Sequence, residues 1–202
     1  MIMKKTTWAL IILAVLPAVL TFTACNPVEK NSRSASFIIV ESILGTNSSG
    51  SSASFLESDV AETNTAGQSY VTADMAKVTL RASLLDPAPI IGTSQFEDIM
   101  LDRYIVSYSR TDGRNRQGVD IPYSFEGSLS QLLEVGTSKT ISIIVVRGVA
   151  KLEPPLIGLV QNRAEGILEV TAKIEFYGHD LADHKVKAEG YLTIFFANYA
   201  DN

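Results

Sequence analysis

Residues 168–196 have the sequence LEVTAKIEFYGHDLADHKVKAEGYLTIFF, and this stretch decides the fold. Apolar and polar residues alternate through residues 168–177 and again through residues 185–196, so each run places its apolar side chains on one face, as a half-buried β-strand does. The seven residues between the runs are mostly polar and are few enough to join two antiparallel strands. The stretch therefore predicts a β-hairpin with a polar tip. Gly190 falls on the inward face of its second strand, which predicts a bulge or a closely approaching neighbour.

Further strands are predicted between this hairpin and the N-terminus. Residues 75–85 alternate in the same way, residues 37–40 form a short β-branched and aromatic run, and residues 140–147 are almost continuously apolar, as in a strand buried on both faces. A second hairpin is predicted at Asp112-Gly113, pairing residues 103–110 with 117–125, where Pro122 would confine the returning strand to an edge. Residues 128–134 are the one segment that we assign to a helix, and residues 46–54 are assigned to a loop.

Seven or eight strands separated by polar turns predict an all-β protein, folded as an antiparallel β-sandwich. The C-terminal pattern, VTAKIEFYGHD followed by a polar turn and KVKAEGYLTIFF, resembles the closing hairpin of bacterial immunoglobulin-like domains. The resemblance covers this hairpin alone and implies an immunoglobulin-like sandwich. It implies architecture and not function, because one fold hosts many functions.

The first residues have the layout of an export signal. Lys4 and Lys5 precede an apolar run over residues 8–20, and small residues lead to Cys25. The run is shorter than the roughly 20 residues that a permanent membrane-spanning helix needs. A cysteine directly after Ala24 resembles a bacterial lipobox, which departs here from its usual pattern at Phe22. The resemblance implies lipidation of the Cys25 thiol; the alternative is an ordinary signal peptide.

Lipidation would also account for Cys25 as the only cysteine of the chain, since an exported protein with one free thiol carries a reactive group. The expected organisation is a signal peptide over residues 1–24, the lipidated cysteine and a polar tether over 25–35, and the sandwich over 36–202. The chain thus resembles small bacterial lipoproteins with immunoglobulin-like domains. That resemblance implies an exported, membrane-anchored protein of the cell envelope, and Asn26 favours the outer over the inner membrane where both exist.

Charge and motifs limit the function classes. Without residues 1–24, which include Lys4 and Lys5, the chain has 15 basic and 22 acidic residues, a net charge of −7. This argues against binding to nucleic acid. No G-x-S-x-G elbow, S-x-x-K pair or phosphate-binding glycine loop is present, so the sequence favours a non-enzymatic protein and indicates no cofactor. The predicted role is structural or binding, with the membrane, envelope proteins or glycans as partners.

Both histidines of the chain lie in the predicted hairpin tip, with His179, Asp180, Asp183 and His184 within six residues. Imidazole and carboxylate groups suit zinc or a similar ion, so a metal-binding or metal-dependent envelope protein is one alternative function. The other interpretation is a solvated turn in which Asp180 or Asp183 bonds backbone amides.

Two further groups of residues are candidate binding elements. Arg110, Arg114 and Arg116 flank the Asp112-Gly113 turn and are suited to a carboxylate or phosphate, or else keep an exposed turn soluble. Tyr191 and Phe195 lie two alternation steps apart on the outer face and are suited to stacking on a sugar, or else pack beneath a loop or the second sheet. A carbohydrate-binding module is therefore a third possible function.

Overall fold

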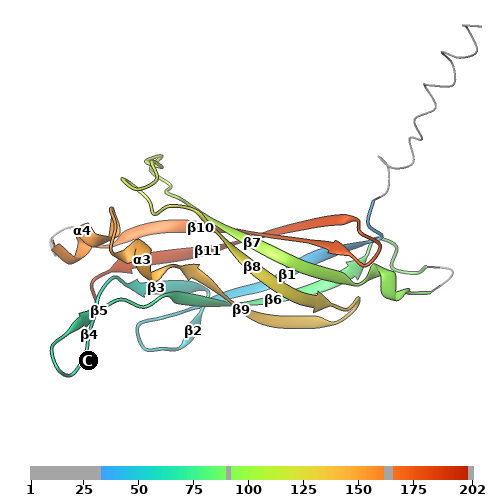
Figure 1. Ribbon diagram of the computed structural model, residues 1–202, viewed down its shortest axis with the longest axis horizontal. Helices are drawn as coiled ribbons and strands as arrows, with labels where there is room; N and C mark the ends of the chain where they lie inside the picture. Colours follow the sequence, from blue (N-terminus) through green and yellow to red (C-terminus); the bar gives the residue numbers. More distant parts are fainter. Residues whose placement is uncertain (1–32, 90–91, 162–165, 200–202) are drawn as a thin grey trace, which may run out of the picture. The chain divides into compact units, whose positions relative to one another are not determined.

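The computed structural model describes residues 33–89, 92–161 and 166–199, and these form a sandwich of two β-sheets (Figure 1). The prediction of an all-β sandwich is confirmed. The predicted signal peptide, Cys25 and all but the last residues of the predicted tether lie outside the described residues. Ser34 is already buried, and the backbone oxygen of Ala35 accepts a hydrogen bond from Leu85. The packed domain therefore begins at Ser34.

The first sheet has four antiparallel strands in the order β2-β1-β6-β9. Their bounds are β1 (Ser36–Thr46), β2 (Ser52–Ala53), β6 (Asp74–Leu84) and β9 (Ser138–Val146). β1 is longer than the run predicted at residues 37–40, because a bulge between Val40 and Ser42 shifts the inward and outward positions by one. The shift interrupts the alternation by which a strand is recognised in a sequence.

The second sheet has five strands in the order β3-β11-β10-β7-β8. Their bounds are β3 (Phe55–Asp59), β7 (Ile99–Ser109), β8 (Phe125–Leu133), β10 (Leu168–Asp180) and β11 (Lys185–Ala197). β3 runs parallel to β11, and the other pairs are antiparallel. The predicted C-terminal hairpin is present as β10 and β11, paired without a register shift from Leu168 opposite Phe196 to His179 opposite Lys185.

The strand order is that of an immunoglobulin-like sandwich. β1, β6 and β9 take the places of strands A, B and E, and β7, β10 and β11 take those of C, F and G, with β8 added beside C. The first long strands of the described chain lie in different sheets: β1 pairs with β6 in the first sheet, and β3 pairs with β11 in the second.

Gly190 allows the two sheets to approach each other closely. A Cβ atom at this position would lie 2.6 Å from the Cδ1 atom of Ile43 and 3.1 Å from Cγ1 of Val40, both on β1. The predicted close neighbour is confirmed, and the β10–β11 pairing has no bulge here.

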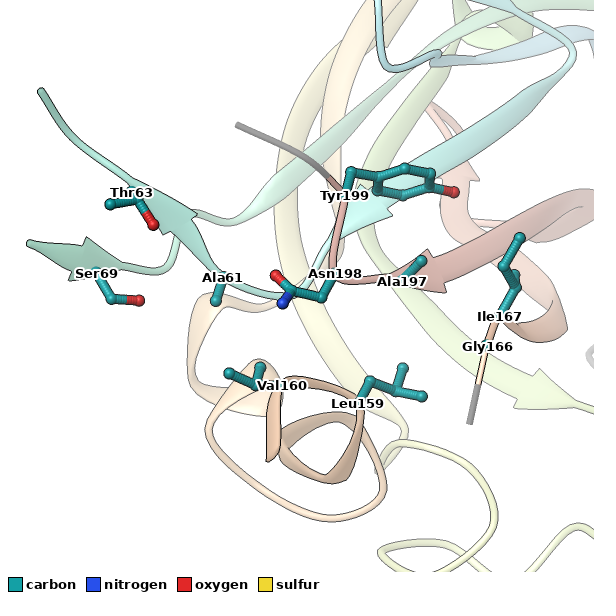
Figure 2. Close-up of a pocket in the computed structure, with 10 residues that line it drawn as sticks. All are labelled: Ala61, Thr63, Ser69, Leu159, Val160, Gly166, Ile167, Ala197, Asn198 and Tyr199. Atoms are coloured by element: carbon teal, nitrogen blue, oxygen red, sulfur yellow. The ribbon is translucent and has the colours of Figure 1, made fainter. Parts of the chain in front are cut away.

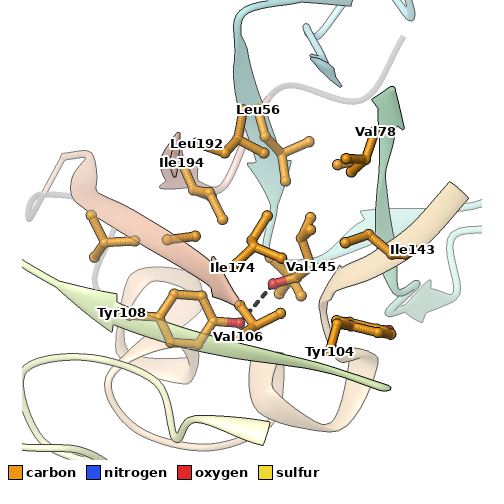
Figure 3. Close-up of a cluster of buried hydrophobic side chains, with 14 of the residues drawn as sticks. Leu56, Val78, Tyr104, Val106, Tyr108, Ile143, Val145, Ile174, Leu192 and Ile194 are labelled. Atoms are coloured by element: carbon orange, nitrogen blue, oxygen red, sulfur yellow. Dashed lines mark hydrogen bonds between the residues drawn. The ribbon is translucent and has the colours of Figure 1, made fainter. Parts of the chain in front are cut away.

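The core lies between the sheets and is built from the inward residues of the predicted alternations (Figure 3). Val78 and Leu80 on β6 and Ile174 and Phe176 on β10 are completely buried. A hydrogen bond crosses the core: the Tyr108 hydroxyl on β7 donates to the backbone oxygen of Val145 on β9 at 2.7 Å. Burial raises the pKa of Tyr108 above its usual range, so the hydroxyl remains a donor.

Two predictions between residues 103 and 134 are wrong. Residues 128–134 are not a helix, because β8 covers residues Phe125–Leu133, and its residues alternate between half-buried and exposed along most of its length. β7 pairs with β8, which includes only Phe125 of the predicted partner segment; residues 117–124, with Pro122, lie outside the strands. The segment LSQLLE fits a helix locally, but β7 offers an unpaired edge that only an extended segment can occupy.

Short elements complete the described chain: the ribbon of β4 (Glu62–Thr63) and β5 (Ser69–Tyr70), the 3-10 turn η1 (Gln95–Glu97), and the helices α3 (Gly148–Lys151) and α4 (Leu156–Gln161). The helices are separated by Pro154 and Pro155, which interrupt regular structure as their sequence predicts.

Candidate functional site

The two ends of the sandwich differ. At one end, the Ser34 end, the chain enters the domain: β1 begins there, β7 and β11 also begin there, and β6 and β10 finish there. At the opposite end lie α3, α4 and the β4–β5 ribbon (Figure 1). The described residues form neighbouring recesses at this second end, which we call the recess end.

One of these recesses has a volume of about 850 Å3 and is lined by both apolar and polar residues (Figure 2). α4 contributes Leu159 and Val160, the last residue of β11 contributes Ala197, and Ile167 stands at the rim with 61% of its surface exposed. Polar groups line the remainder, namely Thr63, Ser69, Asn198 and Tyr199. An exposed Ile167 beside a concave apolar surface is typical of a binding site for another molecule. We call this surface the apolar recess.

A second recess of about 760 Å3 adjoins the first and shares Thr63 and Tyr199 with it. Its carboxylates are those of Glu57, Asp59, Glu62 and Asp74, so we call it the acidic recess. Burial, followed by the charges of Glu57 and Asp59, raises the pKa of Tyr199 to about 12. Two carboxylates are held locally, since Glu57 accepts a hydrogen bond from the Ser48 amide and Glu62 accepts one from the Thr72 hydroxyl.

A completely buried lysine supports the acidic recess from below. Lys151 of α3 has a fully buried side chain, and its Nζ donates to the backbone oxygen of Asp59 at 2.6 Å and lies 3.0 Å from Oδ2 of Asp74. The Ser58 hydroxyl donates to the same Asp74 oxygen at 2.6 Å. Desolvation raises the pKa of Asp74, and the Lys151 charge opposes that rise. The pair joins α3 to β3 and β6 and fixes the floor of the recess.

Sequence reasoning did not find this ion pair. Lys151 is a single cation in the segment GVAKLEPP, and nothing in its neighbourhood distinguishes it from a solvated lysine. The only available signal is its position between an apolar strand and a double proline, where a short helix returns to the core.

The proposed metal residues occupy two separate pairings. Nδ1 of His179 lies 3.1 Å from the Asp102 carboxylate, whereas Nδ1 of His184 lies 2.9 Å from Asp180. Asp180 is buried and accepts the backbone N–H groups of Ala182 and His184, at 3.0 and 2.8 Å. Desolvation acts to raise the pKa of Asp180, but its hydrogen bonds together hold it below the usual range.

Asp180 therefore closes the β10–β11 turn through local backbone amides, which is the second of the two interpretations of this loop. Asp183 takes the left-handed conformation that such a tight turn requires, with φ of 68°. Throughout the part of the chain that the structure describes, no three histidine, cysteine or acidic side chains come together as a metal site would require.

The three arginines lie near one another, but carboxylates of their own loop already bind them. Arg110 and Arg114 both contact Asp112, at 2.6 and 3.0 Å, and Arg116 contacts Asp120 at 3.0 Å. The Arg114 amide and the two guanidinium groups lower the pKa of Asp112 to about 2. Arg110 and Arg114 also line a smaller recess of about 400 Å3 that shares Leu159 and Ile167 with the apolar recess. The loop thus belongs to the recess end.

The two aromatic candidates differ in exposure. Tyr191 has 57% of its surface exposed, and its hydroxyl donates to Glu189 at 3.0 Å. Phe195 is half-buried, and its ring meets that of Phe55 edge-on with centroids 5.8 Å apart. Of the two, only Tyr191 presents a largely open surface.

The fold and the site define a class: an immunoglobulin-like β-sandwich with recesses gathered at the end opposite to the one where the chain enters. Comparisons with protein-family models, with curated proteins and with solved structures found no match for this chain. Among the described residues, no helix has the length and apolar character needed to cross a bilayer.

Proposed function

We propose that this chain is an exported, lipid-anchored protein of the cell envelope whose sandwich binds a partner at its recess end. The anchor is the diacylglycerol-modified Cys25 implied by the lipobox resemblance, and Cys25 is the only thiol in the chain. Each acyl methylene contributes about 0.8 kcal/mol to membrane binding, so two or more chains hold a protein stably.

The observation that carries the proposal is the opposition of the two ends. Eight residues, 26–33, separate Cys25 from Ser34, the first buried residue of the part of the chain that the structure describes, so the Ser34 end stays near the anchor. The recesses lie at the other end, beyond strands such as β1 of 11 residues, which at about 3.4 Å per residue span roughly 37 Å. A lipid-anchored domain arranged in this way presents its recesses away from the membrane.

The residues of the recess end favour binding over catalysis. The described lining of the apolar and acidic recesses contains hydroxyl, amide and carboxylate groups and neither histidine nor cysteine. The buried cation Lys151 is engaged with Asp59 and Asp74. The apolar floor beside exposed Ile167 suits an apolar side chain of a partner protein, and the adjacent carboxylates and arginines supply charge for selectivity.

The first experiment tests the anchor. The full chain and its Cys25→Ser variant are expressed in a bacterium that processes lipoproteins, and intact mass and membrane partition are compared. We expect an acylated mass and membrane association for the unaltered chain, and release of the variant into the soluble fraction. An unmodified thiol, or a variant that remains on the membrane, contradicts the anchor.

The second experiment tests the recess. A photo-crosslinking amino acid is placed at Ile167, at the rim of the apolar recess, or at the equally exposed Tyr191 on the face of the second sheet. In the organism that produces the protein, we expect a discrete adduct from position 167 and none from 191. An adduct from position 191 alone would contradict binding at the recess. It would indicate instead that the binding surface is the sheet face around Tyr191, as considered for a carbohydrate or protein contact.

A further inference from the structure

Three turns of the Ser34 end are tied to the first residues of the domain. The Leu85 amide, after β6, donates to the backbone oxygen of Ala35 at 2.8 Å. The Ser36 hydroxyl donates to the backbone oxygen of Glu97 in η1 at 2.5 Å. The β10–β11 turn joins them, because the Leu181 amide donates to the backbone oxygen of Asp98 at 3.0 Å. All three turns therefore surround the point at which the chain enters the sandwich.

Each of these turns carries an exposed large apolar side chain. Phe96 is 66% exposed and Leu85 is 62% exposed, the two highest values among the large apolar side chains of the described residues, and Leu181 is 41% exposed. We call these three residues the apolar rim. Phe37 adds a partly exposed ring: it is paired with Ser83 and so lies diagonal to Leu85 on the outer face.

Two of the three turns that carry the rim are closed by local hydrogen bonds. Ser94 caps η1, with its hydroxyl accepting from the Phe96 amide at 3.3 Å, and the Glu97 carboxylate accepts from the Ser94 amide at 2.8 Å. The turn carrying Leu181 is closed by Asp180 through the Ala182 and His184 amides. Apolar groups presented on fixed turns have already lost backbone freedom, so contact with an apolar phase costs little further entropy.

We propose that the apolar rim inserts into the interfacial layer of the membrane that holds the lipid anchor. The inference rests on the proposed lipidation of Cys25. Nine Cα–Cα steps connect Cys25 to Ser34, a reach of at most about 30 Å. The tether thus keeps the rim within contact distance of the lipid surface, and that surface is the partner to which three separate apolar tips at one end are suited.

The charges beside the rim determine the lipid that it prefers. Asp86, Glu97 and Asp183 lie on the three turns that carry the rim, and the cations beside them are the exposed Lys185 and Arg33, which directly precedes Ser34. An anionic bilayer repels this carboxylate excess. Insertion therefore depends on apolar contact, is strongest on zwitterionic lipid and weakens as anionic lipid is added.

The test uses the lipidated full chain, because acylation of Cys25 leaves no free thiol. Single cysteines replacing Leu85, Phe96 or Leu181 are labelled with an environment-sensitive fluorophore, and the control is Ile167→Cys at the recess end, where the side chain is about as exposed as Leu85 and Phe96. Each protein is bound to phosphatidylcholine vesicles containing a lipid-attached quencher in the interfacial region. We expect at least twofold stronger quenching at the three rim positions than at position 167, and a shift to shorter emission wavelength at the rim alone.

A second variant separates insertion from mere proximity. With the label at position 96, Leu85→Ser and Leu181→Ser together are expected to reduce quenching at least twofold, while acylated mass and vesicle association stay unchanged. If the proteins bind the vesicles but the label emits as it does in water at all four positions, insertion of the apolar rim is contradicted, whereas the lipid anchor is still supported. An unacylated Cys25 with no association overturns both proposals.

Discussion

At the scale of single residues, Lys151 is the side chain on which the recess end depends most. Replacing it with alanine leaves the Asp74 carboxylate largely buried beside Ser58 without its cation, and breaking a buried pair from one side is strongly destabilising. We expect Lys151→Ala to lower the free energy of unfolding by about 3 kcal/mol, the low end of that effect because Asp74 borders a recess. Urea unfolding of the soluble Cys25→Ser form measures it.

The matched control is Lys173→Ala. Lys173 is also paired with two acidic residues, Glu175 and Glu189, but on the exposed face of the second sheet. Solvent screens such pairs, so we expect no measurable change. Equal effects of the two substitutions would show that the Lys151 pair contributes nothing particular to the fold.

Gly190 supports a second prediction at this scale. An alanine Cβ would enter the space occupied by Ile43, so we expect Gly190→Ala to destabilise the domain by about 1–2 kcal/mol through overpacking. Gly158 in α4 is the control, because a Cβ there meets no atom within 4 Å and alanine favours a helix. Thermal unfolding should rank Gly158→Ala at or above the unaltered protein and Gly190→Ala below it. The reverse order would contradict the close approach of the sheets.

At the scale of elements, the loop of residues 110–124 is organised by Asp112. Its folded-state pKa of about 2 lies below the ordinary value of 3.8, so the charged carboxylate stabilises the folded loop above pH 3.8, and that contribution is lost as the pH falls through about 2. We expect Asp112→Asn to loosen the loop at neutral pH without unfolding the sandwich. Amide hydrogen exchange of residues 110–116 measures the loosening.

Direct titration of the Asp112 carboxylate by NMR gives the complementary result. A midpoint near the ordinary value would show that Arg110 and Arg114 are not held by Asp112 in solution, and the two guanidinium groups would then be available to an anionic ligand.

At the scale of the whole molecule, Tyr108 links the two sheets. Its hydroxyl binds the backbone oxygen of Val145, which lies where the pairing of β6 and β9 shifts register, between Asp74 and Met75. We expect Tyr108→Phe to cost about 1–2 kcal/mol, because it leaves a buried carbonyl without this donor. Tyr191→Phe, which alters an exposed hydroxyl, should have no effect, and chemical denaturation of both compares them. If Tyr108→Phe left the free energy of unfolding unchanged, the Val145 carbonyl would have to accept a hydrogen bond from another donor.

The two ends of the sandwich give the whole molecule its polarity. The Ser34 end carries apolar tips around the point where the chain enters, and the recess end carries concave surfaces with both signs of charge. One fold thereby accommodates the proposed membrane contact and the proposed partner contact without overlap, since the long antiparallel strands separate them.

The sequence by itself determined the all-β class, the β10–β11 hairpin and the inward positions of β6, because alternation with a period of two is a local property of the chain. At Gly190 the missing side chain predicted either a bulge or a close neighbour, and the structure decided for the neighbour. Only the tertiary structure decided that residues 125–133 form a strand, because the unpaired edge of β7 overrides a local pattern that fits a helix equally well. Likewise, only packing decided that Lys151 is buried against Asp74, since the burial of a charge depends on residues far apart in the chain.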